Sequence, residues 1–471
     1  LMAEPQLKSA AMALGTESIR KLLMQYAVPA VVAMTASSLY NMVDSIFIGH
    51  GVGPLAISGL ALTFPLMNLA AAFGSLVGVG AATLVSMRLG QRDYATAQNV
   101  LGNVVMLNLI LGIGFGLVAQ LFLDPILYFF GASEATIGYA REYMTVILAG
   151  NVVTHMYLGL NSVLRASGHP RKAMYATINT VIINAVLDPL FIYGFGWGIR
   201  GAAIATILAQ IISLMWQFRL LSDRSELIHF RRGIYRLRGK IVRDILSIGM
   251  SPFLMNLTAC FIVILINKGL KTYGGDLMIG AYGIVNRLAF VFVMIVMGVN
   301  QGMQPIAGYN FGAQQYDRVL RVLRLTIICA VCITTTGFLV GEFAPHLAVS
   351  LFTTDEELIR LSVEGMRIVF ICFPIIGFQM VATNFFQSIG MAGKAIFMSL
   401  SRQLLFLMPG LLFLPHFFEV STPWDGSWGV WCAMPVSDLM ATVVAFFMLT
   451  HQLRKFRAEH AARSAENRPT L

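Results

Sequence analysis

The chain has 471 residues, of which 57% are hydrophobic and only 12% are charged. Soluble domains carry about 25% charged residues, so this composition excludes an ordinary soluble domain and predicts that most of the chain is embedded in lipid. The formal net charge is +10. Positive cytoplasmic loops and attraction to anionic headgroups account for that charge, so we expect no nucleic-acid partner.

Apolar stretches of about 20 residues, the length that a helix needs to cross the hydrocarbon core, follow one another along the chain. The first half holds six of them, at 22–47, 55–80, 99–122, 140–163, 171–193 and 201–221. The second half holds six more, at 245–268, 279–306, 320–343, 362–386, 394–416 and 427–450. The sequence therefore predicts twelve transmembrane helices, an even number that places both termini on one side of the membrane.

Short polar motifs recur between these stretches at one constant spacing. The motif GQRDY at 90–94 recurs as GAQQY at 312–316. At the same offset, Gly390 is the counterpart of Gly168. One offset shared by separated motifs indicates that a whole half-protein was duplicated. The predicted fold is all-α and integral to the membrane, with two pseudo-symmetric six-helix lobes, an internal repeat that is common among secondary transporters.

The distribution of Lys and Arg predicts which side of the membrane each loop faces. The loops at 49–54 and 417–428 contain neither residue. The connection after the sixth span is rich in both: Arg224, Arg231, Arg232, Arg236, Arg238, Lys240 and Arg243. Both termini should therefore be cytoplasmic.

The expected organisation has five parts. They are a cytoplasmic N-terminal segment at 1–21, a six-helix lobe at 22–221, a basic cytoplasmic linker at 222–243, a second six-helix lobe at 244–450 and a cytoplasmic tail at 451–471. The tail is polar after His451, and we expect it to fray.

Two acidic residues, Asp44 and Asp188, lie inside predicted spans rather than in loops. An ionisable residue in a span costs about 2.5–3.5 kcal/mol, so it is a candidate functional residue by default. Tyr40 precedes Asp44 by four residues, and Asn184 precedes Asp188 by four. Each carboxylate thus has an oxygen-bearing neighbour on the same helical face. Such oxygen ligands suit a hard cation or a proton.

A structural alternative is that the two acids only hydrogen-bond neighbouring helices. The repeat argues against it. At the offset that relates the duplicated motifs, Asp44 corresponds to Ile266 and Asp188 to Gly410, so the second half lacks both acids. A purely architectural role would more readily have survived in both copies.

Other polar residues in the spans give weaker signals. Asp438 lies near the non-cytoplasmic end of the twelfth span, where a satisfied interfacial acid is one interpretation, and His155 is more typical of hydrogen-bonded structure than of a titrating site. Flexible Met side chains and amides are candidates for the wall of a substrate cavity. The residues predicted for that wall are Met255, Asn256, Met294, Met297 and Gln301.

Several motifs together resemble the multidrug and toxic compound extrusion (MATE) family. They are the Tyr40 and Asp44 pair in the first span, LGQRDY at 89–94, NAVLDPLFIYG at 184–194 and the long basic linker. The resemblance covers nearly the whole chain and is closest to the DinF-like and archaeal-type subgroup. It implies antiport, in which inward movement of H⁺ or Na⁺ drives export of amphipathic, often cationic, drugs.

The resemblance also implies where the coupling ion binds. In this subgroup a cation or proton site in the first lobe is formed by residues that match Asp44, Asn184, Asp188 and Thr206, which would be the ligands if the ion is Na⁺. By the same resemblance, Tyr40 and Asn161 join its hydrogen-bond network. The NorM-type branch instead has an important glutamate in the seventh span, and residues 249–268 contain no acid.

Two other functions remain as alternatives. A flippase for lipids or polysaccharide precursors, of a related fold, would line its cleft with several basic residues, whereas Arg287 and Lys268 are the few clear intramembrane candidates. An enzyme or receptor is disfavoured because HExxH, Walker and GxSxG motifs are absent, and no cofactor is expected. We expect a monomer in the bilayer of a bacterial or archaeal cell (inner) membrane, with small-molecule drugs and organic cations as its partners.

Overall fold

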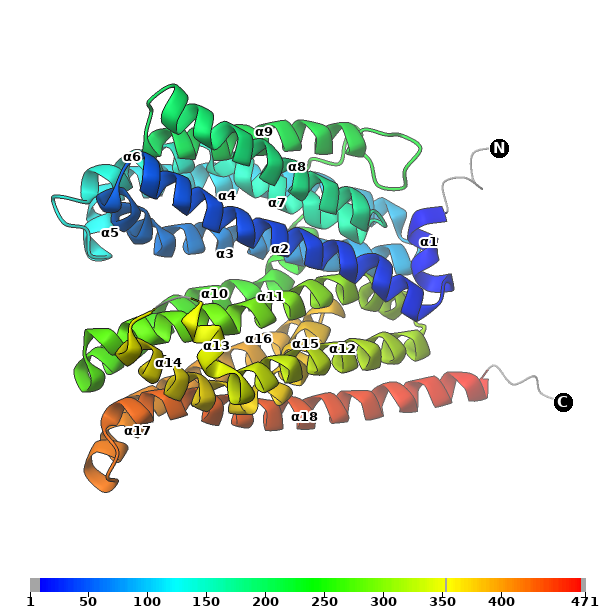
Figure 1. The fold of residues 1–471 in the computed structure, drawn as a ribbon. Helices are drawn as coiled ribbons and strands as arrows, with labels where there is room; N and C mark the ends of the chain where they lie inside the picture. Colours follow the sequence, from blue (N-terminus) through cyan, green and yellow to red (C-terminus); the bar gives the residue numbers. More distant parts are fainter. Residues whose placement is uncertain (1–8, 352–353, 467–471) are drawn as a thin grey trace. The chain divides into compact units, whose positions relative to one another are not determined.

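The computed structural model describes residues 9–351 and 354–466, and these residues are helical without β-strands. Residues 1–8 of the expected N-terminal segment and 467–471 of the expected tail lie outside the described part. The helices pack into two units (Figure 1). One unit joins the residues up to Glu17 with Val28–Asn256, and the other joins Ser18–Ala27 with the residues from Leu257 onward.

The first unit is built from long antiparallel helices joined by short loops. Its elements are α1 (Ser9–Thr16), α2 (Ile19–Gly51), α3 (Pro54–Gly90), α4 (Tyr94–Leu121), α5 (Leu123–Phe129), α6 (Ile137–Ala149), α7 (Asn151–Ala166), α8 (Pro170–Pro189), the π-helix η1 (Leu190–Gly194) and α9 (Ile199–Leu221). The helix α10 (Gly239–Gly274) begins in this unit and ends in the second.

The second unit repeats this organisation. Its elements are α11 (Asp276–Gly312), α12 (Tyr316–Phe343), α13 (Pro345–Ser350), α14 (Glu356–Val369), the 3₁₀ turn η2 (Phe370–Cys372), α15 (Phe373–Ser388), α16 (Ala392–Leu400), the π-helix η3 (Ser401–Leu407), α17 (Met408–Ser421) and α18 (Gly426–Glu466).

The described helices confirm an all-α membrane fold. Eleven of them, counted within the described residues, are long and apolar enough to cross a bilayer. The remaining predicted span, the fourth at 140–163, is broken, because α6 and α7 meet at an angle of 55° around Gly150. A Cβ atom at this glycine would lie 2.5 Å from the Ile207 side chain, so the bend brings the Gly150 backbone close to α9.

The duplicated motifs adopt the same unusual backbone in both halves. Arg92 and Gln314, which occupy matching positions in the two motifs, both have φ of 60°, a conformation that is uncommon for residues other than glycine. Each precedes the N-terminus of a long helix, α4 or α12. Asp93 caps α4, and hydrogen bonds from Thr96 hold the pKa of this partly exposed carboxyl below its usual value. The repeat is therefore a structural one.

The tail does not fray as predicted. Helix α18 continues to Glu466 because Phe456 gives it a tertiary contact. The Phe456 side chain is buried and stacks on Tyr316, with ring centroids 5.4 Å apart. Arg463 also donates to Gln314 at 2.5 Å. Both contacts hold the helix against the duplicated motif.

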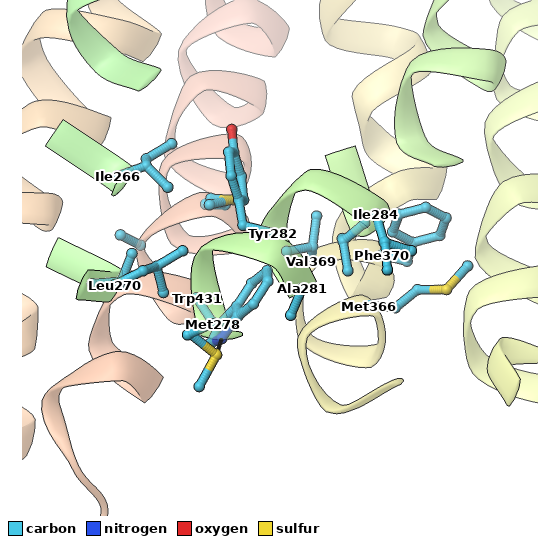
Figure 2. Close-up of a cluster of buried hydrophobic side chains, with 14 of the residues drawn as sticks. Ile266, Leu270, Met278, Ala281, Tyr282, Ile284, Met366, Val369, Phe370 and Trp431 are labelled. Atoms are coloured by element: carbon cyan, nitrogen blue, oxygen red, sulfur yellow. Dashed lines mark hydrogen bonds between the residues drawn. The ribbon is translucent and has the colours of Figure 1, made fainter. Parts of the chain in front are cut away.

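A hydrophobic cluster organises the second unit (Figure 2). Met278 and Tyr282 of α11 contribute to it together with Phe370 and Trp431. The Trp431 indole donates to the Met278 sulfur at 3.4 Å, which satisfies its buried N–H. Because lipid is as apolar as this cluster, close packing rather than the hydrophobic effect stabilises such contacts in a bilayer.

The central linker is docked on the first unit through two buried amide side chains of α4. The Gln98 amide contacts the Leu227 carbonyl and accepts from the His229 N–H at 3.2 Å. Asn103 Nδ2 donates to the Arg236 carbonyl at 3.3 Å. The linker therefore has a defined path over the start of α4.

We expect Gly102→Ala to release this linker. A Cβ at Gly102 would overlap the Ile234 carbonyl oxygen, and relieving that overlap costs about 1–3 kcal/mol of docking free energy. Trypsin should then cut faster after the exposed Arg231 and Arg232. Gly114→Ala, in the same helix but with open space around it, is the control. Equal cleavage rates in the two variants would contradict the docking.

Candidate cation site

The candidate site lies entirely within the first unit, on three helices. Helix α2 supplies Tyr40 and Asp44, α8 supplies Asn184 and Asp188, and α9 supplies Thr206. The residues on α2 and on α8 are four apart, so each pair stacks on one helical face. Asp188 remains helical although Pro189 follows it, and the helix widens only afterwards, into η1.

Direct contacts join these residues. The Tyr40 hydroxyl donates to Asp188 Oδ2 at 3.2 Å, and Asn184 Nδ2 donates to Thr206 Oγ1 at 3.3 Å. The Asp44 and Asp188 carboxyls also face each other at hydrogen-bonding range. The Tyr40 hydroxyl also lies at hydrogen-bonding range of Thr206, so the five residues form one connected polar group inside the helix bundle.

The site holds more oxygen acceptors than it has donors. Asp44, Asn184 and Asp188 are 7%, 2% and 0% exposed, and the Oδ1 atom of each is buried without a hydrogen-bond partner. A buried polar atom without a partner costs about 1–3 kcal/mol. Three such oxygens on neighbouring residues are therefore a ready set of ligands for a cation.

The charges lead to the same conclusion. Within the described residues, neither carboxylate forms an ion pair with Lys or Arg, and two carboxylates in contact repel unless a proton or cation lies between them. No group of three His, Cys, Asp or Glu side chains is placed to hold a metal ion in the described part of the chain. Two carboxylates with an amide and a hydroxyl can bind a hard cation or a proton. They are not the ligand set that a transition metal prefers.

Asn161, the sixth predicted residue, lies apart from the acids. Its Nδ2 atom donates to the Ala173 carbonyl at 3.0 Å and to Thr177 Oγ1 at 3.3 Å, and its Oδ1 accepts from Arg165 at 3.2 Å. These contacts place Asn161 against the first turns of α8. Asp188 is near the other end of that helix.

The predicted cavity residues are divided between the units. Met255 and Asn256 lie at the end of the first unit, whereas Met294, Met297 and Gln301 lie on α11 in the second. An apolar hollow in the second unit is lined by residues of α12, α15 and α18, and none of the predicted wall residues belongs to it. The substrate cavity therefore stays a prediction.

An intramembrane ion pair in the second unit was not predicted. Asp438 is paired with Arg402 of η3, whose Nε donates to Oδ1 at 2.7 Å. Arg402 is a cation well inside the eleventh apolar stretch, which is the signal that could have found it. His155 is hydrogen-bonded to the Ala70 carbonyl at 2.9 Å, as expected of a structural histidine.

Comparisons with known proteins assign this chain to a family. A family model described as MatE matches residues 29–190 and 250–412, one match in each half. The multidrug export protein MepA of Staphylococcus haemolyticus (strain JCSC1435) is 26% identical over 432 residues, which cover 92% of this chain and 93% of MepA.

Solved structures are also similar to this chain. The MATE multidrug transporter DinF-BH, solved as a complex, is 34% identical, with a TM-score of 0.84 and coverage of 93% of this chain and 96% of DinF-BH. A MOP superfamily transporter from Pyrococcus furiosus shares the fold, with a TM-score of 0.88 at 24% identity over 95% of this chain and 99% of its own.

The matched ranges span Asp44, Asn184, Asp188 and the duplicated motifs, whereas Thr206 lies outside them. Proteins of this family are transporters, and the described helices are long and apolar enough for a multi-pass membrane protein. The chain belongs to the MatE family and is a membrane transporter rather than an enzyme.

Proposed function

We propose that this chain exports amphipathic, often cationic, organic compounds in antiport with H⁺ or Na⁺, with the cation bound in the first unit at Asp44, Asn184, Asp188 and Thr206. The observation that carries the proposal is the set of three buried oxygens without partners in the described site. The names of MepA and DinF-BH support drugs as the transported compounds.

Tyr40 positions the acids in this proposal. Its hydroxyl donates to Asp188 Oδ2 and holds that carboxyl in the orientation in which it faces Asp44. When H⁺ or Na⁺ binds, it offsets the repulsion between the carboxylates and changes which helix packing has the lowest free energy. A ligand can shift a conformational equilibrium only by its differential affinity for the two states. The Asp44 and Asp188 carboxylates repel each other before the cation binds and are neutralised after it binds. This change provides the differential affinity that alternating access requires.

The organisation expected from the sequence is part of the proposal. The lobes are 22–221 and 244–450, the basic linker at 222–243 is cytoplasmic, and both termini are cytoplasmic in a bacterial or archaeal cell membrane. Lys and Arg sorting supports this orientation. The working form is a monomer, because the whole candidate site lies within one unit of one chain.

Ethidium efflux from proteoliposomes tests the function and identifies the ion. We expect that a gradient of either H⁺ or Na⁺, imposed in the direction in which the cation enters the cell, drives ethidium efflux. The cation whose gradient drives efflux is the coupling cation. Vesicles with no gradient are the control. Folded protein that exports nothing under either gradient would overturn the proposal and favour the flippase alternative, which flipping of a fluorescent lipid would then test.

A further inference from the structure

Three helices of the first unit present polar faces to one another beyond the acid pair. On α9 these residues are Thr206, Gln210, Ser213 and Gln217, spaced by four, three and four positions. That spacing keeps all four on one helical face. Polar residues at membrane depth are costly and face a bundle interior or a hydrated path. A full polar face on a predicted span therefore calls for a functional explanation.

The facing helices have matching residues. Helix α8 continues from Asp188 and Asn184 through Thr180 and Thr177, again three or four positions apart. With a rise of 1.5 Å per residue, Thr177 lies about 16 Å along α8 from Asp188, towards the cytoplasmic start of the helix. The polar face of α8 thus leads away from the acid pair over about half a bilayer.

Side-chain contacts connect the faces in order. After the Asn184 contact to Thr206, Thr154 of α7 donates to Gln210 at 2.6 Å. One turn further on, Thr180 donates to Ser213, also at 2.6 Å. These hydrogen bonds join α7, α8 and α9 at successive levels.

The contacts continue to the end of α7. The Tyr157 hydroxyl lies at hydrogen-bonding range of Thr177 and Thr180, and Thr177 accepts from Asn161 at 3.3 Å. Asn161 in turn accepts from Arg165, which is in the last turn of α7. We call this set of facing polar residues the polar stripe: Asp188, Asn184, Thr206, Gln210, Thr154, Ser213, Thr180, Thr177, Tyr157, Asn161 and Arg165.

A buried acceptor beside the polar stripe shows that it is not fully satisfied. Gln217 is 0% exposed, and its Nε2 donates to the Tyr157 carbonyl at 3.3 Å, but its Oε1 has no partner. Together with the unpartnered oxygens of Asn184 and Asp188, this atom places open acceptors at both ends of the stripe. Water or a passing cation would satisfy them.

The second half of the chain provides an internal comparison. At the offset of the repeat, Asn184 corresponds to Phe406 and Thr180 to Arg402, which is paired with Asp438. The second copy thus has an aromatic ring and a fixed ion pair where the first has amide and hydroxyl groups. The polar stripe, like the acid pair, belongs to the first half alone.

We propose that the polar stripe is the route by which the coupling cation leaves the acid pair towards the cytoplasm, with Arg165 as the positive charge that closes its cytoplasmic end. This inference rests on the proposed antiport. Hydroxyl and amide oxygens pass a proton along hydrogen bonds or partly replace the hydration of Na⁺. The guanidinium of Arg165 repels the coupling cation. It thereby prevents the cation from passing along the polar stripe when no drug is exchanged.

The route is tested by separating cation binding from cation release in the full chain. Thr180→Val removes the hydroxyl with little change of shape, and Thr180→Ser keeps the hydroxyl. We expect Thr180→Val and Ser213→Ala to slow drug-driven cation uptake by about tenfold, which corresponds to about 1.4 kcal/mol on the barrier. Cation affinity should stay unchanged, and Thr180→Ser should retain the native rate. Ser162→Ala is the control, because Ser162 lies on α7 outside the stripe and bonds to the Leu158 carbonyl.

Arg165 is tested by cation flux without drug. We expect Arg165→Gln to leak cation down its gradient and Arg165→Lys, which keeps the charge, to remain tight. Native uptake rates in Thr180→Val and Ser213→Ala, weakened cation affinity in either, or a tight Arg165→Gln protein would overturn this inference. If the native chain does not couple drug export to cation entry at all, that result overturns the proposed antiport rather than the route.

Discussion

Asp188→Asn is expected to abolish cation-driven efflux while the protein remains folded. The change keeps the size of the side chain but removes the charge that Tyr40 orients and that repels Asp44. Without that repulsion, H⁺ or Na⁺ no longer binds one state much better than the other. A loss of only about 1.4 kcal/mol of differential binding reduces coupling tenfold, and loss of the charge removes more than that. Asp44→Asn should have the same effect.

The measurement is ethidium efflux under the gradient that drives the native chain, combined with ethidium binding by fluorescence polarisation in detergent. Binding should persist while transport is lost. Asp124→Asn is the matched control, because Asp124 is also an acid of the first unit but forms an exposed ion pair with Arg141 at 2.8 Å. Such surface pairs contribute about 0–1 kcal/mol. Gradient-driven efflux by Asp188→Asn at the native rate would refute the role of the acid pair.

The helices and the acid pair could be predicted because each depends on signals local in sequence. Apolar length alone fixes which segments can span the bilayer. Asp44 and Asp188 stood out because a charge in such a segment is rare, and the spacing of Tyr40 and Asn184 showed which faces they share. Their mutual contact across α2 and α8 was implied only by family resemblance, since one sequence does not report which spans are neighbours.

The features that were missed depend on partners distant in sequence. Arg402 and Asp438 look unrelated until α18 packs on η3, and α18 is stable past His451 only because Phe456 finds Tyr316. The polar face of α9 was different, because its regular spacing could have been read directly from the sequence. It was overlooked because Thr, Gln and Ser are individually common in spans and carry no charge.

Gly249→Ala is expected to destabilise the first unit, and its effect should be among the largest of any substitution by a single methyl group. A Cβ at Gly249 of α10 would overlap the Leu76 carbonyl oxygen of α3, and a Cβ at Gly80 would overlap the Ile245 carbonyl oxygen. The two glycines therefore let both backbones touch, as small residues do where membrane helices cross. Overpacking of this kind costs about 1–3 kcal/mol, and a rigid backbone on both sides favours the upper value.

The repeat makes the same prediction at a second site. Gly302, the counterpart of Gly80 in the second half, lies in the second unit, where an added Cβ would be 2.5 Å from the Ala27 Cα. Thermal unfolding in detergent should thus show lower midpoints for Gly249→Ala, Gly80→Ala and Gly302→Ala. Gly74→Ala is the control, because the nearest neighbour of a Cβ at this position of α3 would be 3.6 Å away, an ordinary contact. If Gly249→Ala melts at the same temperature as Gly74→Ala, then α3 and α10 do not cross in backbone contact. A stable Gly80→Ala beside an unstable Gly302→Ala would show that the duplicated crossing is tight in only one copy.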